Sequence, residues 1–334
     1  MIRLFLSLLF CWALLPAAQA APNFVILVGD GIGRDWMSCY SSSHQTPNLD
    51  ALASEGIQFT VAWGSPDGAS TVKTLTTGQY PHRHDSSSNA ENRLLESLRA
   101  SGYVTASLYG EPDGTELEAA IQPLLKSDRF CLYYELSHSG NAPTSIEGYT
   151  EYVTSIDQRV GQVLEMTEAA APIVIFTSNS ASRISGNMNG ETYPESSGVN
   201  ANWSVHVPLI VKAPEIIPEP RSRRDLIDAS DLFPTVLELA DVPVPDNHPV
   251  DGKSFVPVLR GSDDPFEKRN WIYAQSGNFR MMRDWHHYID DGGAFHDLDK
   301  DPFQREEVSV QDKQAPHRRE RLQMILDRFP KAGN

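Results

Sequence analysis

Short, mainly apolar runs alternate with segments of helical periodicity along the chain, and this alternation constrains the fold more than any other feature. The apolar runs lie at residues 23–28, 103–108, 130–134, 172–176 and 208–211. The length and composition of the runs at 23–28, 172–176 and 208–211 are typical of strands that are buried on both faces. Helical signals lie between them, at residues 46–55, 69–78, 94–98 and 146–166. The pattern therefore predicts an α/β fold, in which a mostly parallel sheet is covered by helices on both faces.

The two ends of the sequence differ from this central part. Residues 1–20 combine Arg3, an apolar stretch at 4–15 and the small-residue site Ala18-Gln19-Ala20, which is the arrangement of a cleavable signal peptide. From about residue 266 the sequence changes to short aromatic-rich strands and turns. We therefore expect a signal peptide at 1–20, an α/β domain at 21–265 and a small C-terminal β-sheet subdomain at 266–334. The protein is expected to be secreted or periplasmic, with no membrane span.

The charge of the chain limits its partners. The formal net charge is −16 at pH 7, and such a surface repels nucleic acid, because phosphate contacts require clustered Lys and Arg. The densest basic cluster, at residues 221–224, lies in a proline-rich loop, and we interpret it as a solvated face. A highly sulfated polyanion would need a local basic pocket, which the sequence does not reveal.

Cysteine usage leaves the redox state of the chain open. Cys11 belongs to the predicted leader, so Cys39 and Cys131 remain in the mature chain. They could form one disulfide in an oxidising compartment, or stay as two buried thiols. The count of cysteines does not decide between the two.

Ligands of parallel α/β sheets bind at the carboxyl edge of the strands. The loops predicted to lie at that edge are residues 29–35, 65–71 and 177–182. Candidate functional residues are therefore sought in these three loops.

Several segments, in matching order, resemble one known family. They are residues 22–30, 46–53, 75–84, 207–214, 231–240 with 251–254, and 297–302. Together they span nearly the whole mature chain and are similar to the sulfatases of the alkaline phosphatase superfamily, including arylsulfatases. The resemblance implies an alkaline-phosphatase-like scaffold and, for intact members, hydrolysis of sulfate esters with the help of Ca²⁺. Fold alone does not carry that chemistry to this chain.

The nucleophile that the resemblance implies is missing. Sulfatases convert a Cys or Ser within Cys/Ser-X-Pro-X-Arg to formylglycine, whose hydrate attacks sulfur. When the register is anchored on Gly78, the nucleophile position falls on Gly68, and Ser70 and Val72 stand at the Pro and Arg positions. A shift by two residues places Ser70 at the nucleophile but leaves Thr74 in place of the arginine. Neither register restores the motif.

The metal ligands that the resemblance implies are also reduced. Asp30-Gly31 stands where the family has paired aspartates, and Asn179-Ser180 stands where it has an Asp-Asn or Asp-His pair. Asp35 is close in sequence and is a candidate for a further ligand. Calcium prefers roughly six to eight oxygen ligands. We therefore expect a Ca²⁺ site at Asp30, Asn179 and Asp35 that binds weakly or not at all.

The remaining candidates concern contact with the substrate. His138 is either the family's substrate-facing histidine or an ordinary loop residue. Lys73 is the only cation on the helix predicted at 69–78, and His287 stands where many members have a lysine. Both are candidate substrate-binding residues.

Three functional hypotheses follow from these residues. The favoured one is a sulfatase-family protein that is catalytically impaired or inactive. The second is an active hydrolase of sulfate or phosphate esters, with Ser70 or Thr71 as nucleophile at a helix N-terminus. A two-zinc phosphatase is disfavoured, because Asn179-Ser180-Ala181 breaks the usual Asp-His-Gly. The expected ligand is a sulfated carbohydrate or another small sulfate ester.

Overall fold

The computed structural model describes residues 21–84, 92–137, 143–193, 201–309 and 313–330. The predicted signal peptide and His138 lie outside these ranges. Within them, none of the helices has both the length and the apolar character that a bilayer crossing requires.

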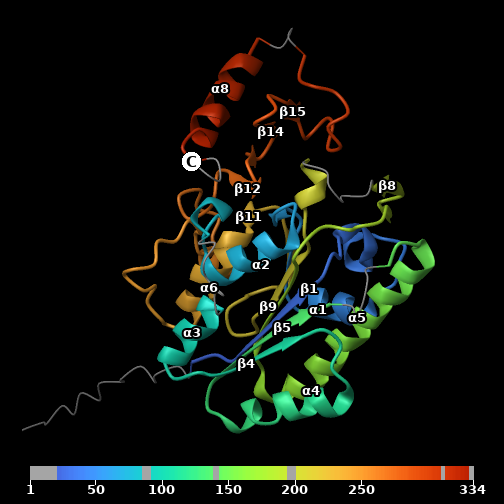
Figure 1. Ribbon diagram of the computed structural model, residues 1–334, viewed down its shortest axis with the longest axis vertical. Coiled ribbons are helices and arrows are strands. Elements are labelled where there is room, and N and C mark those ends of the chain that lie inside the picture. Colours follow the sequence, from blue (N-terminus) through green and yellow to red (C-terminus); the bar gives the residue numbers. More distant parts are fainter. Residues whose placement is uncertain (1–20, 85–91, 138–142, 194–200, 310–312, 331–334) are drawn as a thin grey trace, which may run out of the picture.

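A seven-stranded sheet forms the centre of the α/β part (Figure 1). In spatial order its strands are β10 (Arg221–Arg223), β2 (Ile57–Phe59), β9 (Leu209–Lys212), β6 (Ile173–Ser178), β1 (Phe24–Gly29), β5 (Phe130–Leu136) and β4 (Val104–Tyr109). Strands β4, β5, β1 and β6 are parallel neighbours, whereas β9 runs antiparallel to both β6 and β2. The sheet is thus mixed but mostly parallel, and the predicted fold class is confirmed. Each of the five apolar runs forms a strand.

Helices cover both faces of this sheet because the side chains of its central strand point alternately to either side. Phe24, Ile26 and Val28 of β1 pack in one core cluster, and Val25 and Leu27 pack in another. The first cluster contains residues of α2 (Gly68–Thr77), α3 (Arg93–Ala100), α6 (Leu232–Leu239) and α7 (Val256–Leu259). The second contains residues of α1 (Pro47–Ser54), α4 (Gly114–Ile121) and α5 (Ile146–Thr167).

The C-terminal part forms its own small antiparallel sheet, as the change of sequence texture predicts. Its strands are β12 (Ile272–Ser276), β13 (Phe279–Arg283), β14 (His287–Asp290) and β15 (Phe295–Asp297), and α8 (Ala315–Leu326) packs against β13 and β14 (Figure 1). Strand β12 also contacts a short two-stranded sheet, β11 (Ile227–Asp228) with β3 (Ala62–Trp63). A further hairpin is made by β7 (Gly186–Met188) and β8 (Glu191–Tyr193).

Local sequence determines both ends of α2, the helix on which the candidate site depends. The Asp67 carboxylate caps it by accepting a hydrogen bond from the Ser70 backbone N–H at 2.8 Å. At the other end, Gly78 takes a left-handed conformation with φ of 69°, and its N–H donates to the Thr74 carbonyl. Glycine adopts this conformation without a steric cost.

Candidate functional site

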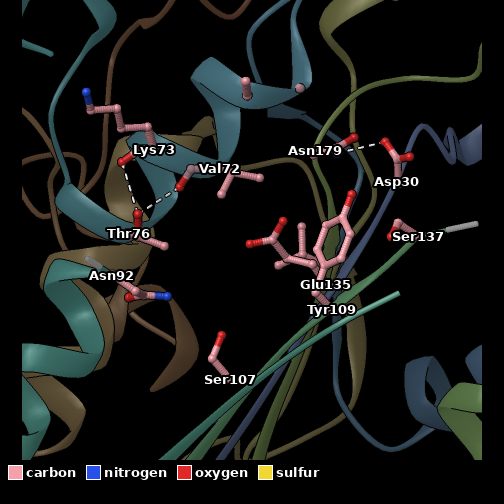
Figure 2. A pocket seen from close by; sticks show the side chains of 13 residues that line it. Asp30, Val72, Lys73, Thr76, Asn92, Ser107, Tyr109, Glu135, Ser137 and Asn179 are labelled. Atoms are coloured by element: carbon pink, nitrogen blue, oxygen red, sulfur yellow. Dashed lines mark hydrogen bonds between the residues drawn. The ribbon is translucent and has the colours of Figure 1, made fainter. Parts of the chain in front are cut away.

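A cavity of about 500 Å³ lies at the carboxyl edge of the sheet. Asp30 after β1, Gly68 at the start of α2, and Asn179 after β6 all line it (Figure 2). These residues come from the three loops that the sequence places at this edge. Glu135 of β5 and Tyr109 of β4 complete the wall opposite α2.

The side chain of Asn179 occupies the space beside Gly68. A Cβ placed on Gly68 would lie 2.9 Å from Asn179 Cγ and 3.0 Å from its Nδ2. Real side chains do not approach this closely, because packed heavy atoms need about 3.5 Å. Any side chain at the first position of α2 would therefore have to displace Asn179.

Asn179 is held in this position by several hydrogen bonds. Its Nδ2 donates to Asp30 Oδ1 at 2.9 Å. Its Oδ1 accepts from the Gly31 N–H at 2.9 Å and from Ser180 Oγ at 3.0 Å. Both ends of the amide are thus engaged by the protein, so a new side chain at Gly68 would have to break these contacts.

Asp30 is engaged by a cation of the chain itself. Arg183 Nη2 donates to Asp30 Oδ1 at 2.6 Å. The arginine side chain also fills the space over Gly31, where a Cβ would lie 2.6 Å from Arg183 Nε. Gly31 has φ of 69°, so a second aspartate here would meet both backbone strain and Arg183. The loop itself is fixed by α5, since Tyr152 donates to the Asp30 carbonyl at 2.7 Å.

Asp35 lies away from this cluster. It is buried in η1 (Arg34–Trp36), and its Oδ1 accepts from Ser182 Oγ at 2.5 Å. Burial raises the pKa of Asp35 to about 6, against the lowering effect of Ser182. Asp35 does not line the cavity that holds Asp30 and Asn179. In the described ranges, no three His, Cys, Asp or Glu side chains gather closely enough to hold a metal ion.

The charges around the cavity are mainly acidic. Asp30 and Glu135 both line it, and burial, helped by the nearby Asp30 charge, raises the pKa of Glu135. Lys73 lines the α2 side, and Figure 2 shows its amino group directed away from Asp30 and Glu135. A sulfate group in this cavity would therefore face the Glu135 carboxylate and an Asp30 carboxylate that Arg183 only partly balances.

The two hydroxyls proposed as alternative nucleophiles lie outside the cavity lining. Thr71 is fully buried, and its Oγ1 accepts from the Ser65 N–H at 2.7 Å, which fixes the turn before α2. Ser70 is half-buried and is not among the residues that face the cavity. Ser107 and Ser137 do line it, although the sequence analysis does not single them out.

His287 lies in another part of the molecule. It is buried on β14, stacks on Phe295 with ring centroids 5.3 Å apart, and has its Nδ1 3.5 Å from Asp284 Oδ1. It does not line the cavity. The structure thus brings together Asp30, Gly68, Lys73 and Asn179, but not Asp35, Ser70, Thr71 or His287.

Two charged residues of the site have weak signals in sequence. Glu135 directly follows the apolar run at 130–134, and a carboxylate at a strand end is a signal that could have been used. Arg183 lies just beyond the loop at 177–182. Nothing in its neighbourhood indicates that it pairs with Asp30, which is far away in the chain.

Comparison with known families matches two segments of the chain. The Sulfatase family model matches residues 22–115, and the model described as N-sulphoglucosamine sulphohydrolase, C-terminal, matches residues 200–329. Human steryl-sulfatase is 29% identical over 150 residues, which are 41% of this chain and 26% of that protein. An ulvan-active sulfatase of Formosa agariphila is 22% identical over 327 residues, covering 80% of this chain and 63% of that one. Matches to the first relatives thus span about a quarter of their length.

Solved structures agree on the fold. A protein solved in complex with its substrate, D-glucosamine-2-N,6-O-disulfate, has a TM-score of 0.71 at 16% identity, over 92% of this chain and 97% of that one. A phosphonate monoester hydrolase of Agrobacterium radiobacter has a TM-score of 0.69 at 18% identity, over 92% and 95%. At such identities the similarity extends to the alkaline-phosphatase-like scaffold alone.

Proposed function

Because the chain belongs to the sulfatase family, we propose that it is an exported relative that does not hydrolyse sulfate esters by the formylglycine route. Its role is then to bind a ligand rather than to cleave it. The observation that carries this proposal is the packing of Asn179 against Gly68. Glycine has no side chain to convert, and the space for a nucleophile is already filled.

The contacts of Asp30 support the same proposal for calcium, the metal that the family implies. Asp30 Oδ1 receives the Arg183 guanidinium at 2.6 Å and the Asn179 amide at 2.9 Å. Asn179 Oδ1 receives two further donors. Calcium would require these oxygens as ligands, and a neighbouring guanidinium repels a divalent cation. These residues therefore do not fit calcium, and we assign it no part in the function.

The acidic cavity supports binding of a sugar through its hydroxyl groups. Carboxylates such as those of Asp30 and Glu135 accept hydrogen bonds from hydroxyls but repel sulfate. The ligand class we propose is a sulfated carbohydrate, the class that one structural relative holds as substrate. Its sulfate group would then lie away from Asp30 and Glu135.

Export rests on the arrangement of residues 1–20. Arg3, the apolar stretch and Ala18-Gln19-Ala20 predict cleavage before Ala21. N-terminal sequencing of protein recovered outside the cytoplasm should therefore begin at Ala21. Recovery of exported protein that begins at Met1 would contradict this part of the proposal.

Restoring the nucleophile tests the catalytic part. Gly68→Cys, produced in a host with the formylglycine-generating enzyme, should remain unmodified by mass spectrometry and inactive on aryl sulfates. The maturation enzyme reads a motif whose Pro and Arg positions are here Ser70 and Val72. Catalytic groups act together on the same developing charge, so single restorations do not rescue turnover. Clear turnover by this single variant would overturn the proposal.

A further inference from the structure

A second cavity, of about 440 Å³, gathers three arginines that are far apart in sequence. Arg34 comes from η1, Arg224 from the loop after β10, and Arg283 from the end of β13. This volume lies in the usual range of small-molecule sites, about 300–1,000 Å³. The loop after β1 contributes to both cavities, since Asp30 lines the first and Arg34 the second.

Arg34 is 8% exposed, hydrogen-bonds to neutral acceptors, and lies over the Tyr40 ring at 5.9 Å. Its Nη1 donates to the Thr60 carbonyl, and its Nη2 donates to His206 Nδ1 at 2.5 Å. Burial, and then the charges of Arg34 and Arg283, lower the pKa of His206 well below its usual value. His206 is therefore a neutral acceptor and offers no charge to balance Arg34.

Arg283 is 3% exposed and is likewise held by neutral acceptors. Its Nε donates to the Asp284 carbonyl at 2.9 Å, Nη1 to Asn202 Oδ1 at 3.1 Å, and Nη2 to the Trp285 carbonyl at 3.2 Å. The carboxylate of Asp284 is used elsewhere: it accepts from Arg321 and from the His287 N–H. Burial, and then repulsion by Arg224, lower the pKa of Arg283 to about 9.

Buried charges in proteins are normally paired, because an isolated ion loses its hydration. In the part of the chain that the structure describes, no carboxylate forms an ion pair with Arg34 or Arg283, and none lines their cavity. Elsewhere, buried arginines do have such partners: Arg269 binds Asp231, and Arg280 binds Asp291. Among the buried arginines of the described residues, Arg34 and Arg283 thus differ from Arg269 and Arg280 in having no carboxylate partner.

The rim of the cavity is polar and suits a sugar. Arg224, which is more exposed, pairs with Asp299 at 2.7 Å. Ser41, Gln58, Asn189 and Ser222 add hydroxyl and amide groups to the lining, and such groups hydrogen-bond to sugar hydroxyls. Arg34 and Arg283 therefore suit an anionic group of a ligand, and the polar rim suits the hydroxyl groups of its sugar.

We propose that this cavity binds a tetrahedral oxyanion group, sulfate or phosphate, carried on a sugar, with Arg34 and Arg283 as its ligands. Guanidinium forks match the oxygens of such groups and bind them with charge-assisted hydrogen bonds. The inference rests on the ligand class of the proposed function. It assigns the sulfate group of that ligand to the arginine cavity, because the acidic cavity disfavours an anion. The net charge of −16 favours a small ligand over a long polyanion.

Calorimetric titration of the whole protein with glucosamine 6-sulfate and glucosamine 6-phosphate tests the proposal, with unsubstituted glucosamine and inorganic sulfate alongside. At least one substituted sugar should bind saturably, one to one. It should bind about tenfold or more tightly than inorganic sulfate, because the rim adds contacts. Unsubstituted glucosamine should not bind measurably. Absence of saturable binding by both substituted sugars would overturn the proposal, and so would equal binding of the sugar and the free ion.

Variants place the binding in this cavity. Arg34→Gln and Arg283→Gln should each weaken binding about tenfold or more, because each removes a charged ligand. The control Arg99→Gln removes the same charge from an exposed residue that hydrogen-bonds to Thr105, and its affinity should stay within about twofold of wild type. Equal affinity in all four proteins would overturn the proposal, and if one variant does not fold the other still decides.

A melting experiment without ligand separates binding from a structural role. If Arg283 serves a ligand, Arg283→Gln removes a buried charge that has no ion-pair partner and should melt no lower than wild type. A purely structural arginine would give a clearly lower melting temperature and unchanged affinity, which would contradict the proposal. Turnover of a sulfate ester in these samples would overturn the proposed function but not this binding site, so the two failures can be told apart.

Discussion

Placing a side chain at Gly68 is the most informative perturbation of the site. In Gly68→Ala, the new Cβ would lie within 3.1 Å of three atoms of Asn179, so the asparagine must move. It then loses some of its hydrogen bonds to Asp30, Gly31 and Ser180. At about 0.5–1.5 kcal/mol for each bond, the loss of two costs about 1–3 kcal/mol.

A gain in helix propensity opposes this cost. Replacing glycine by alanine in a helix stabilises it by up to about 1 kcal/mol. With a mid-range cost of about 2 kcal/mol and this gain, Gly68→Ala should lower the free energy of unfolding by about 1 kcal/mol. The matched control is Gly114→Ala at the first position of α4, where Asp113 provides a similar cap and a Cβ meets nothing within 4 Å. That variant should be neutral or slightly stabilised.

A double-mutant cycle tests the cause. Asn179→Ala removes the side chain that obstructs Gly68, so the double variant should be more stable than the sum of the two single effects predicts, by about 1 kcal/mol or more. Urea unfolding of the four proteins, followed by circular dichroism, measures the coupling. Additive effects, or stabilisation by Gly68→Ala alone, would refute the view that Asn179 fills the nucleophile position.

Three further outcomes are expected. Calcium at millimolar concentration should leave the melting temperature unchanged, because Arg183 forms an ion pair with Asp30. A rise of many degrees that Asp30→Ala abolishes would show a calcium site. Burial raises the pKa of Asp35 in the folded protein to about 6, whereas the unfolded chain releases this proton at a lower pH. As pH rises from about 4 to 6, the wild-type protein therefore loses stability. Asp35→Asn should accordingly gain about 2–3 kcal/mol on the wild type over that interval in urea titrations, and a constant difference would contradict the assignment. Burial, and then the charge of Asp50, raise the pKa of the Cys39 thiol to about 12, and burial raises the pKa of the Cys131 thiol. Both thiols should therefore resist a thiol reagent at pH 8 until urea unfolds the protein. Fewer than two reactive thiols after unfolding would indicate a disulfide.

The architecture can be predicted from the sequence because strands that are buried on both faces have continuous apolar sequences. Strands β1, β5 and β6 are apolar at nearly every position, so they are recognisable without knowledge of their neighbours. Helix α5 is long enough for its periodicity to be evident. Helix α4 is missed, although Asp113 and Glu116 form a capping box, because its short apolar pattern is weak. The open choice for the cysteines is resolved as two free thiols in the structure.

The site is predictable only in part because its chemistry depends on long-range pairs. The convergence of Asp30, Gly68 and Asn179 follows from the rule that parallel strands present their carboxyl ends at one edge. The pairing of Arg183 with Asp30, and the gathering of Arg34 with Arg283, join residues that no local pattern connects. The basic cluster at 221–224 illustrates the same limit, since its interpretation as a solvated face was wrong for Arg223. That side chain is 11% exposed and pairs with Asp225.

Turnover by the unmodified protein tests the central claim most directly. The protein, produced in a host that has the formylglycine-generating enzyme, is assayed with 4-nitrophenyl sulfate and 4-nitrophenyl phosphate beside matched preparations of Asp30→Ala and Ser70→Ala. The filled nucleophile position predicts no turnover above that of the Asp30→Ala preparation with either ester. Turnover of the sulfate or phosphate ester that either substitution abolishes would show a working active site and contradict the account.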